Sequence, residues 1–149
     1  MKNELRKEFT MKIKVVLDDG ATLPTRAHPT DAGLDLYAKE RRMIRPLDWV
    51  KIDTGVHIQI PEGYVGLITS KSGLMANEGI TCRGTIDSGY TGSIQAVLFN
   101  HSRKHYIVEK GQKITQLVIV PIITPEPEWV DALEETDRGD GGFGSTGKF

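Results

Sequence analysis

The sequence predicts an all-β domain that ends in a flexible, glycine-rich segment. Short runs of β-branched and aromatic residues recur along the chain, and turn residues such as Asp53–Gly55 and Pro61–Gly63 separate them. Short strands at this spacing are typical of β-sandwiches and β-barrels. A length of 149 residues is enough for one domain with its own core, without support from disulfides or metals.

The composition excludes several classes of protein. With 38% apolar residues, 26% charged residues and a formal net charge of −1, the chain is expected to fold, and it lacks the strong positive field that nucleic-acid binding requires. No apolar run reaches the ~18 residues of a membrane-spanning helix. We therefore expect neither a nucleic acid nor a membrane as a partner.

The single cysteine and the N-terminal residues favour a cytoplasmic location. Cys82 cannot form an intramolecular disulfide, and the N-terminus lacks the apolar stretch of a signal peptide. We expect Cys82 to be a small core residue and not a nucleophile.

The N-terminal part of the chain predicts an extension, a strand and a loop. Residues 1–10 are charged and weakly periodic and are interpreted as an extension, whereas an alternating strand starts at Met11 and ends at the turn Asp18–Gly20. A loop with two prolines follows, in which we expect His28 to be exposed.

Asp35 interrupts the next apolar strand, between Leu34 and Leu36. In strand alternation its side chain lies on the face opposite the two leucines. Two interpretations stay open: this face is simply the polar side, or the carboxylate lies near a metal or supports another group.

Three further strands precede a change of pattern, and they are expected at Trp49–Ile52, Val56–Ile60 and Tyr64–Ser70. Ser70–Gly79 then favours one or two turns of helix, capped by Ser72 and ended by Gly79. A lysine and a hydroxyl at a helix N-terminus can bind phosphate, although a simple cap accounts for the same residues.

The stretch Gly84–Ser93 places one carboxylate, Asp87, and one aromatic ring, Tyr90, on a glycine-rich turn between two apolar runs. This pattern predicts a β-hairpin with Asp87 at its tip. The display of a reactive carboxylate and an ordinary solvated turn both fit the local residues.

The last core strands are expected at Ile107–Val108 and Ile114–Ile123. Gln116 is polar within the second of these runs, so its amide either faces solvent or is buried and hydrogen-bonded at a site. An acidic linker follows, in which Trp129 and Leu133 lie on one side of a short helix, if one forms.

The domain organisation expected from these patterns is a β-barrel domain over residues 1–137 and a flexible arm over residues 138–149. The arm is rich in glycine and would not hold a fixed fold alone. It nevertheless carries an arginine, an aromatic ring and two hydroxyls, which are the groups that clamp a phosphate and stack on a base. A disordered C-terminus is the alternative.

Five stretches taken together resemble the trimeric all-β dUTPase family, in that family's order: Asp31–Leu36, Ser70–Leu74, Gly84–Gly92, Lys110–Leu117 and Arg138–Gly147. The resemblance covers nearly the whole chain after Met11. It implies a distorted jelly-roll β-barrel that forms a homotrimer, with active sites shared between subunits and closed by the arm. It also implies Mg²⁺-dependent hydrolysis of dUTP to dUMP and pyrophosphate, which keeps uracil out of DNA and supplies dUMP for thymidylate synthesis.

The resemblance further implies a role for each matching residue. Asp87 would activate the water that attacks the α-phosphorus, and Tyr90 would pack beneath the deoxyribose. Mg²⁺ would bind mainly through substrate phosphates and waters, with Asp35 and Gln116 supporting its waters. The other substrate-binding positions are Gly84, Ile86 and Gln95 around uracil, Lys71, Ser72, Gly73 and Gln116 at phosphate oxygens, Phe143 over the uracil, and Arg138, Gly144, Ser145 and Thr146 toward the terminal phosphate.

Three positions depart from the family pattern. Lys71 stands where arginine is common, and a lysine offers a point charge in place of a bidentate fork, so we expect phosphate to be held less tightly there. Thr91 and Gln112 stand where arginine and an acidic residue are frequent, which puts a few intersubunit contacts in doubt.

There are two alternatives to dUTP hydrolysis as the function. The related dCTP deaminase needs a glutamate on the strand after the hairpin, where this chain has Val97, and a valine cannot shuttle protons. A nucleotide-binding or regulatory module without turnover is the other alternative, and the presence of Asp87, Tyr90, Arg138 and Phe143 argues against it. The sequence identifies no regulatory protein partner.

Overall fold

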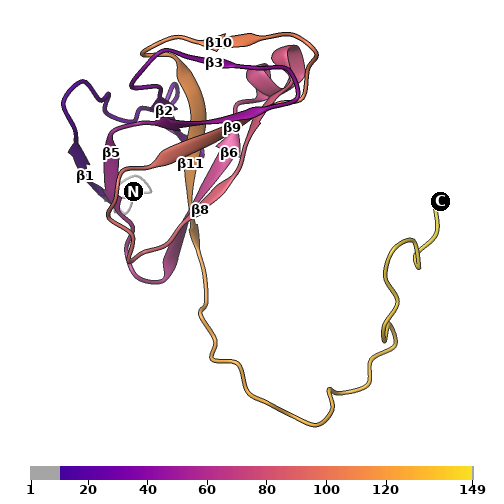
Figure 1. The fold of residues 1–149 in the computed structure, drawn as a ribbon. Helices are drawn as coiled ribbons and strands as arrows, with labels where there is room; N and C mark the ends of the chain where they lie inside the picture. The colour runs from indigo at the N-terminus through magenta and orange to yellow at the C-terminus, as the bar shows by residue number, and fades with distance from the viewer. Residues whose placement is uncertain (1–10, 149) are drawn as a thin grey trace, which may run out of the picture.

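The computed structural model describes residues 11–148, so the expected extension at residues 1–10 lies outside the described residues. Strands and one short helical turn make up a body from which the C-terminal segment extends (Figure 1). The strands are β1 (Lys14–Leu17), β2 (Gly33–Tyr37), β3 (Arg42–Ile44), β4 (Trp49–Asp53), β5 (Val56–Gln59), β6 (Tyr64–Ser70), β7 (Ile80–Cys82), β8 (Gly84–Ile86), β9 (Gln95–Asn100), β10 (Tyr106–Val108) and β11 (Lys113–Pro121).

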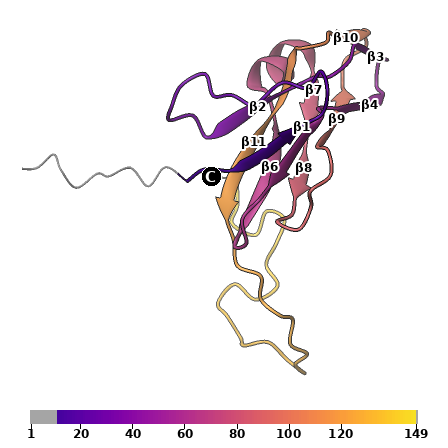
Figure 2. The same ribbon diagram turned by 90° about the vertical axis from the view of Figure 1, so that its left-hand side faces the viewer.

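The strands form four small antiparallel sheets that fold around one core. Their orders are β1-β5, β10-β3, β2-β11-β6-β8 and β4-β9-β7. The turned view in Figure 2 shows β11, β6 and β8, which are neighbours in one sheet, crossing the body side by side. The all-β prediction is confirmed, and the arrangement suits a distorted jelly-roll barrel.

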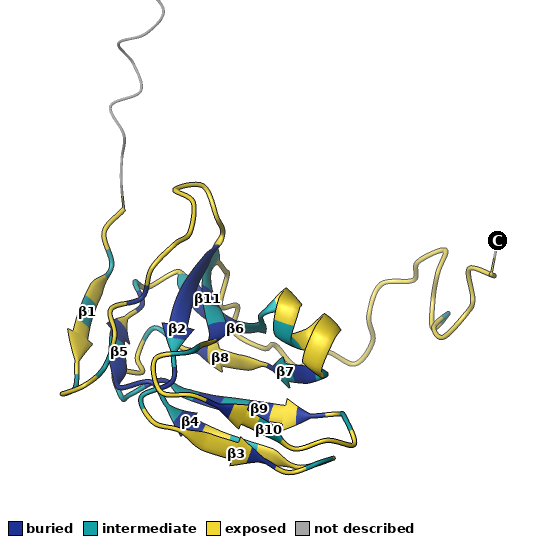
Figure 3. Cartoon of the chain, turned by 90° about the horizontal axis from the view of Figure 1, so that it is seen from above, coloured by how far each residue is buried: buried dark blue, intermediate teal, exposed yellow. Residues whose placement is uncertain are grey.

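The core lies where the sheets face one another. Leu36, Ile52, Leu98 and Leu117 are fully buried, and each comes from a different strand. Figure 3 shows β2 as mostly buried and the helical turn as largely exposed. Cys82 is also buried in this cluster, which confirms its expected place.

The helical segment after β6 differs from the expected capped helix. Leu74–Glu78 forms a single wide turn of π-helix whose N-cap is Gly73, and no side chain caps it, so the capping role expected for Ser72 is wrong. Gly79 ends the turn as predicted, because its left-handed backbone (φ 68°) lets its N–H donate to the carbonyl of Met75.

The predicted hairpin is only partly formed. β7 pairs with β9, as a hairpin requires, but β8 leaves this sheet and pairs with β6 instead. The chain between β8 and β9, residues 87–94, is here called the Asp87 loop.

The chain beyond Pro121 runs away from the body and contains no helix over residues 122–148. Trp129 and Leu133 are both almost fully exposed, so the short helix considered for this linker is not formed. A short isolated helix is marginal without a surface on which to bury its apolar face. No helix within residues 11–148 is long and apolar enough to cross a membrane.

Candidate active site

The Asp87 loop displays a carboxylate and an aromatic ring at the surface. Asp87 follows the last residue of β8 and is exposed, and the N–H of Tyr90 donates to the Asp87 carbonyl (3.0 Å) to close a tight turn. The Tyr90 hydroxyl donates to the carbonyl of Ser93 (2.9 Å), so the ring folds back over its own loop.

Gly92 makes room for this ring. A Cβ at Gly92 would lie 2.5 Å from the Tyr90 hydroxyl oxygen and 2.7 Å from the ring carbon that carries it. The position of Tyr90 therefore depends on a residue without a side chain two positions later.

The base of the loop is fixed to the body by β4 and by the turn that follows it. The carbonyl of Ile94 accepts hydrogen bonds from the Thr54 N–H (3.1 Å) and the Thr54 hydroxyl (2.7 Å). The Asp53 carboxylate accepts from the Ser93 hydroxyl and from Gln95 Nε2 (2.8 Å).

Asp53 is held ionised by these contacts. Burial raises the pKa of Asp53. The hydrogen bonds from Ser93, Gly55 and Gln95 and the charge of Lys39 lower it by more than burial raises it, so the net pKa lies below the ordinary value. The loop is thus anchored on a charged, hydrogen-bonded group.

The strands on either side of the loop present free backbone edges. β8 is the edge strand of its sheet, and β9 pairs with β7 only from Leu98 onward. Gly84 and Ile86 therefore lie on one edge, and Gln95 lies at the start of the other, with backbone groups that can pair with a planar ligand.

A second polar cluster lies on β2, β11 and the end of β6, and we call it the Asp35 cluster (Asp35, Lys71, Lys113, Gln116). Asp35 is buried at 4% exposure, and its oxygens pair with Lys71 and with Lys113 (Nζ to Oδ2, 2.9 Å). Gln116 lies directly opposite Asp35 in the β2–β11 register, and its Nε2 donates to the carbonyl of Ser70 (3.2 Å).

The burial of β2 and the packing of Gln116 narrow the open interpretations of Asp35 and Gln116. Both faces of β2 are buried around Asp35, so its side is not a simple solvent face. The Gln116 amide is half-buried, and a Cβ at Gly33 would lie 2.3 Å from its side-chain oxygen, so Gly33 provides the space in which it lies. Asp35, Lys71 and Gln116 together line a hollow of ≈ 270 Å³.

The electrostatics of the Asp35 cluster favour its charged forms. Burial raises the pKa of Asp35. The hydrogen bonds and charges of Lys71 and Lys113 lower it by more than burial raises it, so the net pKa lies below the ordinary value. The same contact with Asp35 raises the pKa of Lys113. Ser72 and Gly73 follow Lys71 and are exposed beside the cluster.

The Asp87 loop and the Asp35 cluster lie at opposite ends of β6. Gly66 pairs with Ile86, so Asp87 follows β8 beside the start of β6, whereas Lys71 follows its last residue. At a strand rise of about 3.3 Å per residue, the six residues between these levels place the two groups about 20 Å apart.

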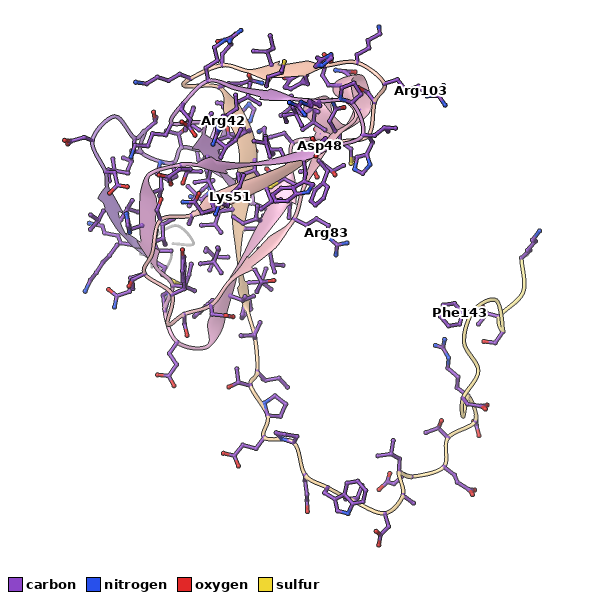
Figure 4. The ribbon with its side chains drawn as sticks, viewed as in Figure 1. Arg42, Asp48, Lys51, Arg83, Arg103 and Phe143 are labelled. Atoms are coloured by element: carbon purple, nitrogen blue, oxygen red, sulfur yellow. The ribbon has the colours of Figure 1, made fainter. Side chains whose placement is uncertain are left out.

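The remaining predicted residues lie on the C-terminal segment, away from both parts. Phe143 is fully exposed and projects from the far end of this segment, well away from the side chains of the body (Figure 4). The Arg138 side chain donates to the carbonyl of Gly141 (2.9 Å) within the segment itself. Gly144, Ser145 and Thr146 are exposed beside them.

The donor set fits a magnesium ion carried by a phosphate ligand. Within residues 11–148, no three His, Cys, Asp or Glu side chains are arranged to hold a metal ion. Mg²⁺ often keeps several waters and binds through phosphates with few protein ligands. Asp35 and Gln116 line one hollow, where the Asp35 carboxylate can accept hydrogen bonds from such waters and the Gln116 amide can donate to a water or a phosphate.

Sequence reasoning did not find two residues of these networks, namely Lys113 and Asp53. Each acts through strand register, since Lys113 and Gln116 reach Asp35 across the β2–β11 pair and Asp53 lies opposite Gln95 in the β4–β9 pair. No local sequence signal marks such partners.

The comparisons with known proteins agree with one another. A family model described as dUTPase matches residues 19–147. The deoxyuridine 5'-triphosphate nucleotidohydrolase of Clostridium tetani is 47% identical over 144 residues, which cover 95% of this chain and 99% of that protein. The enzyme of the same name from Debaryomyces hansenii is 39% identical and covers 99% of this chain and 95% of its own length.

Solved structures show the same likeness. A mutant of the Staphylococcus bacteriophage 80alpha dUTPase with dUpNHpp has a TM-score of 0.87 at 35% identity and covers 93% of this chain and 100% of that chain. A mutant dUTPase from phage phi11 of S. aureus, described for its coordination of a structural Mg(II) ion, has a TM-score of 0.78 at 33% identity and covers 84% of this chain and 100% of that chain.

Proposed function

Since this chain belongs to the dUTPase family and hydrolyses dUTP to dUMP and pyrophosphate with Mg²⁺, we propose that Asp87 is the general base of the reaction. The carboxylate is exposed on a tight turn and accepts a proton from the water that attacks the α-phosphorus. A positioned base of this kind contributes about 10²- to 10⁴-fold to a rate.

Tyr90 and the neighbouring backbone edges recognise the nucleoside. The Tyr90 ring, folded back on its loop, packs beneath the deoxyribose and leaves no room for a 2′-hydroxyl. Gly84, Ile86 and Gln95 lie on strand edges whose backbone groups pair with uracil, while the side chain of Gln95 is engaged by Asp53.

The Asp35 cluster and the residues after it bind the phosphates. Lys71 supplies positive charge, Ser72 and Gly73 offer a hydroxyl and a backbone N–H, and Gln116 contacts the α-phosphate or a water of the metal. Asp35 orients Lys71 and supports waters of the metal from its buried position. When bound on the triphosphate, Mg²⁺ neutralises phosphate charge and stabilises the transition state.

The single observation that carries the proposed arrangement of the active site is the separation of Asp87 from Lys71 along β6. Adjacent phosphates and the attacking water must lie within a few Å of their protein partners, but the two groups are about 20 Å apart within one chain. One site must therefore combine the Asp87 loop of one subunit with the Asp35 cluster of another. A homotrimer with shared sites meets this requirement, since a closed ring provides one such junction per subunit.

The C-terminal arm closes the site. Its described residues, 138–148, contact neither the Asp87 loop nor the Asp35 cluster of the same chain, and the extended segment from residue 122 gives the arm the reach to act on another subunit. Phe143 covers the uracil, and Arg138, Gly144, Ser145 and Thr146 bind the terminal phosphate. We place the enzyme in the cytoplasm, because a free, buried Cys82 suits a reducing compartment.

A pyrophosphate-release assay tests this function. The enzyme should cleave dUTP in the presence of Mg²⁺ and leave dCTP, dTTP and UTP largely intact, and chelation of the metal should lower the rate. Release of ammonia from dCTP would identify a deaminase, and nucleotide binding without any turnover would identify a regulatory module.

A further inference from the structure

His57 connects the Asp87 loop to a neighbouring strand. On β5, Val56 and Ile58 point into the core, whereas His57 points outward. Its Nδ1 lies 2.8 Å from the carbonyl oxygen of Thr91, next to Tyr90. Among the contacts of residues 11–148, this is the one hydrogen bond from a side chain outside the loop to positions 87–92.

The other ring nitrogen of His57 faces a carboxylate. Nε2 lies 3.1 Å from Oδ1 of Asp18, at the end of β1. A carbonyl oxygen and a carboxylate oxygen can only accept hydrogen bonds, so both contacts form together only when both ring nitrogens carry a proton. The geometry therefore selects the imidazolium form of His57.

The charges around His57 come from three neighbouring elements. Asp18 follows β1 and Asp53 ends β4, and Lys39 lies between their carboxylates, with Nζ 3.6 Å from Asp18 and 3.8 Å from Asp53. Lys14, on β1, lines the same surface hollow as His57. Two carboxylates and two ammonium groups thus surround the ring, and it is a carboxylate that contacts it directly.

The titration of His57 agrees with this geometry. The hydrogen bond to the Thr91 carbonyl raises the pKa of His57, burial lowers it, and the hydrogen bond and charge of Asp18 and the charge of Asp53 raise it again, to a net value above the ordinary one. Both bonds of the ring are therefore present together below this raised pKa, and one of them is lost as the pH rises through it.

We propose that His57 is a positioning residue of this enzyme, which in its doubly protonated form clamps the Thr91 carbonyl to Asp18 and so fixes the loop that carries Asp87 and Tyr90. The proposal rests on the proposed function of that loop. When the ring loses one proton, one of the two bonds is lost, and the loop is no longer tied through His57 to β1.

Two substitutions separate this role from simple packing. In His57→Asn the side-chain amide takes the place of Nδ1, so it can donate to Thr91 but cannot titrate. In His57→Leu the space is filled without a donor. Both are compared with wild type by measuring kcat and KM for dUTP between about pH 5.5 and about pH 9, with His105→Asn as a matched control in the loop after β9.

The expected result is a ratio that changes with pH. The ratio is the kcat/KM of wild type divided by that of His57→Asn. The effects of the ionisation of dUTP and of the other groups cancel in this ratio. It should fall about three- to tenfold as the pH rises through the titration of His57. This titration is followed by the ring C–H signal in NMR, which is assigned by its absence in His57→Asn. His57→Leu should lie about tenfold below His57→Asn at low pH, and the control should match wild type.

Several outcomes would overturn the proposal. A ratio that is independent of pH, or a His57→Leu enzyme with wild-type kcat/KM, shows that the clamp does not position the loop. If His57→Leu fails to fold, Asp18→Asn tests the clamp instead. Because Asp18 raises the pKa of His57, this substitution should move the midpoint of the kcat/KM profile to lower pH, and an unchanged midpoint contradicts the clamp. Failure of the base role is seen separately, as turnover that persists in Asp87→Asn while the His57 titration is unaltered.

Discussion

At the scale of single residues, the proposed chemistry depends on where two side chains of one loop are held. Asp87 must reach a water, and Tyr90 must present its ring to the sugar. The structure places Tyr90 by a hydrogen bond to the Ser93 carbonyl and by the space over Gly92. Both placements can be tested by substitutions that change very few atoms.

Replacement of Asp87 with Asn should remove turnover but not binding. The amide is nearly the same size and cannot accept a proton, so kcat for dUTP should fall at least about a hundredfold. The Kd for a non-hydrolysable dUTP analogue, measured by calorimetry, should change only a few-fold. Substantial residual turnover would remove Asp87 from the role of base.

Replacement of Gly92 with Ala should displace Tyr90. The new Cβ would overlap the ring, so we expect kcat/KM for dUTP to fall about tenfold and the preference for dUTP over UTP to shrink. Gly89→Ala is the matched control, because a Cβ at Gly89 meets nothing within 4 Å. Equal effects of the two substitutions would show that Tyr90 is not placed by this contact.

At the scale of elements, β2, β6 and β11 are joined by the Asp35 cluster as well as by their backbone ladders. Asp35 lies on β2, Lys113 on β11, and Lys71 directly after β6. The lysine side chains are 29% and 44% exposed, so either can turn toward water if the carboxylate is removed. The cluster therefore contributes to stability without forming a closed buried ion network.

Asp35→Asn should lower the free energy of unfolding by about 1–3 kcal/mol at neutral pH. Because the folded pKa of Asp35 lies below its unfolded value, its contribution is present above about pH 4 and is lost as the pH falls through the lower folded pKa. Urea unfolding at a fixed protein concentration measures the difference.

Glu40→Gln is the control for this prediction, since Glu40 forms an exposed pair with Arg42 and should change stability by no more than about 0.5 kcal/mol. A difference between wild type and Asp35→Asn that persists unchanged in acid would contradict the contribution assigned to the ionised carboxylate.

Most of the strands were predictable from the sequence because their signals are local, whereas the short strand β3 (Arg42–Ile44) and the pairings of the strands were not. Alternation and turn residues predicted the strands around Pro61–Gly63, and the apolar run with Gln116 predicted the last core strand. The departure of β8 from the hairpin toward β6 depends on which edge was free, and the partners of Asp35 depend on strand register. No short stretch of sequence predicts either the pairing of β8 or the partners of Asp35.

At the scale of the whole molecule, the predicted active-site residues fall into three groups that one chain does not bring together. The Asp87 loop and the Asp35 cluster are separated by the length of β6, and the arm stands apart from both. The five motifs of the family resemblance identified the members of the groups and implied a shared site, and their separation within one chain supports the proposal that they meet between subunits.

Deletion of residues 138–149 should collapse activity and leave the body intact. The buried core ends with Leu117 on β11, so the arm contributes no core residue. We expect kcat/KM for dUTP to fall at least about a hundredfold, with an unchanged unfolding midpoint and an unchanged number of subunits by light scattering. A truncated enzyme with the normal rate would show that the arm is only a tail.

Subunit complementation tests the shared site most directly. Asp87→Asn and Ser72→Ala damage opposite ends of the proposed site, and each variant alone should be nearly inactive. If each site takes Asp87 from one subunit and Ser72 from another, co-refolding equal amounts should restore about a quarter of the wild-type rate of pyrophosphate release, since half of the subunits supply each intact group. No gain over the separate variants, in mixed oligomers verified by mass, would contradict a site divided between chains.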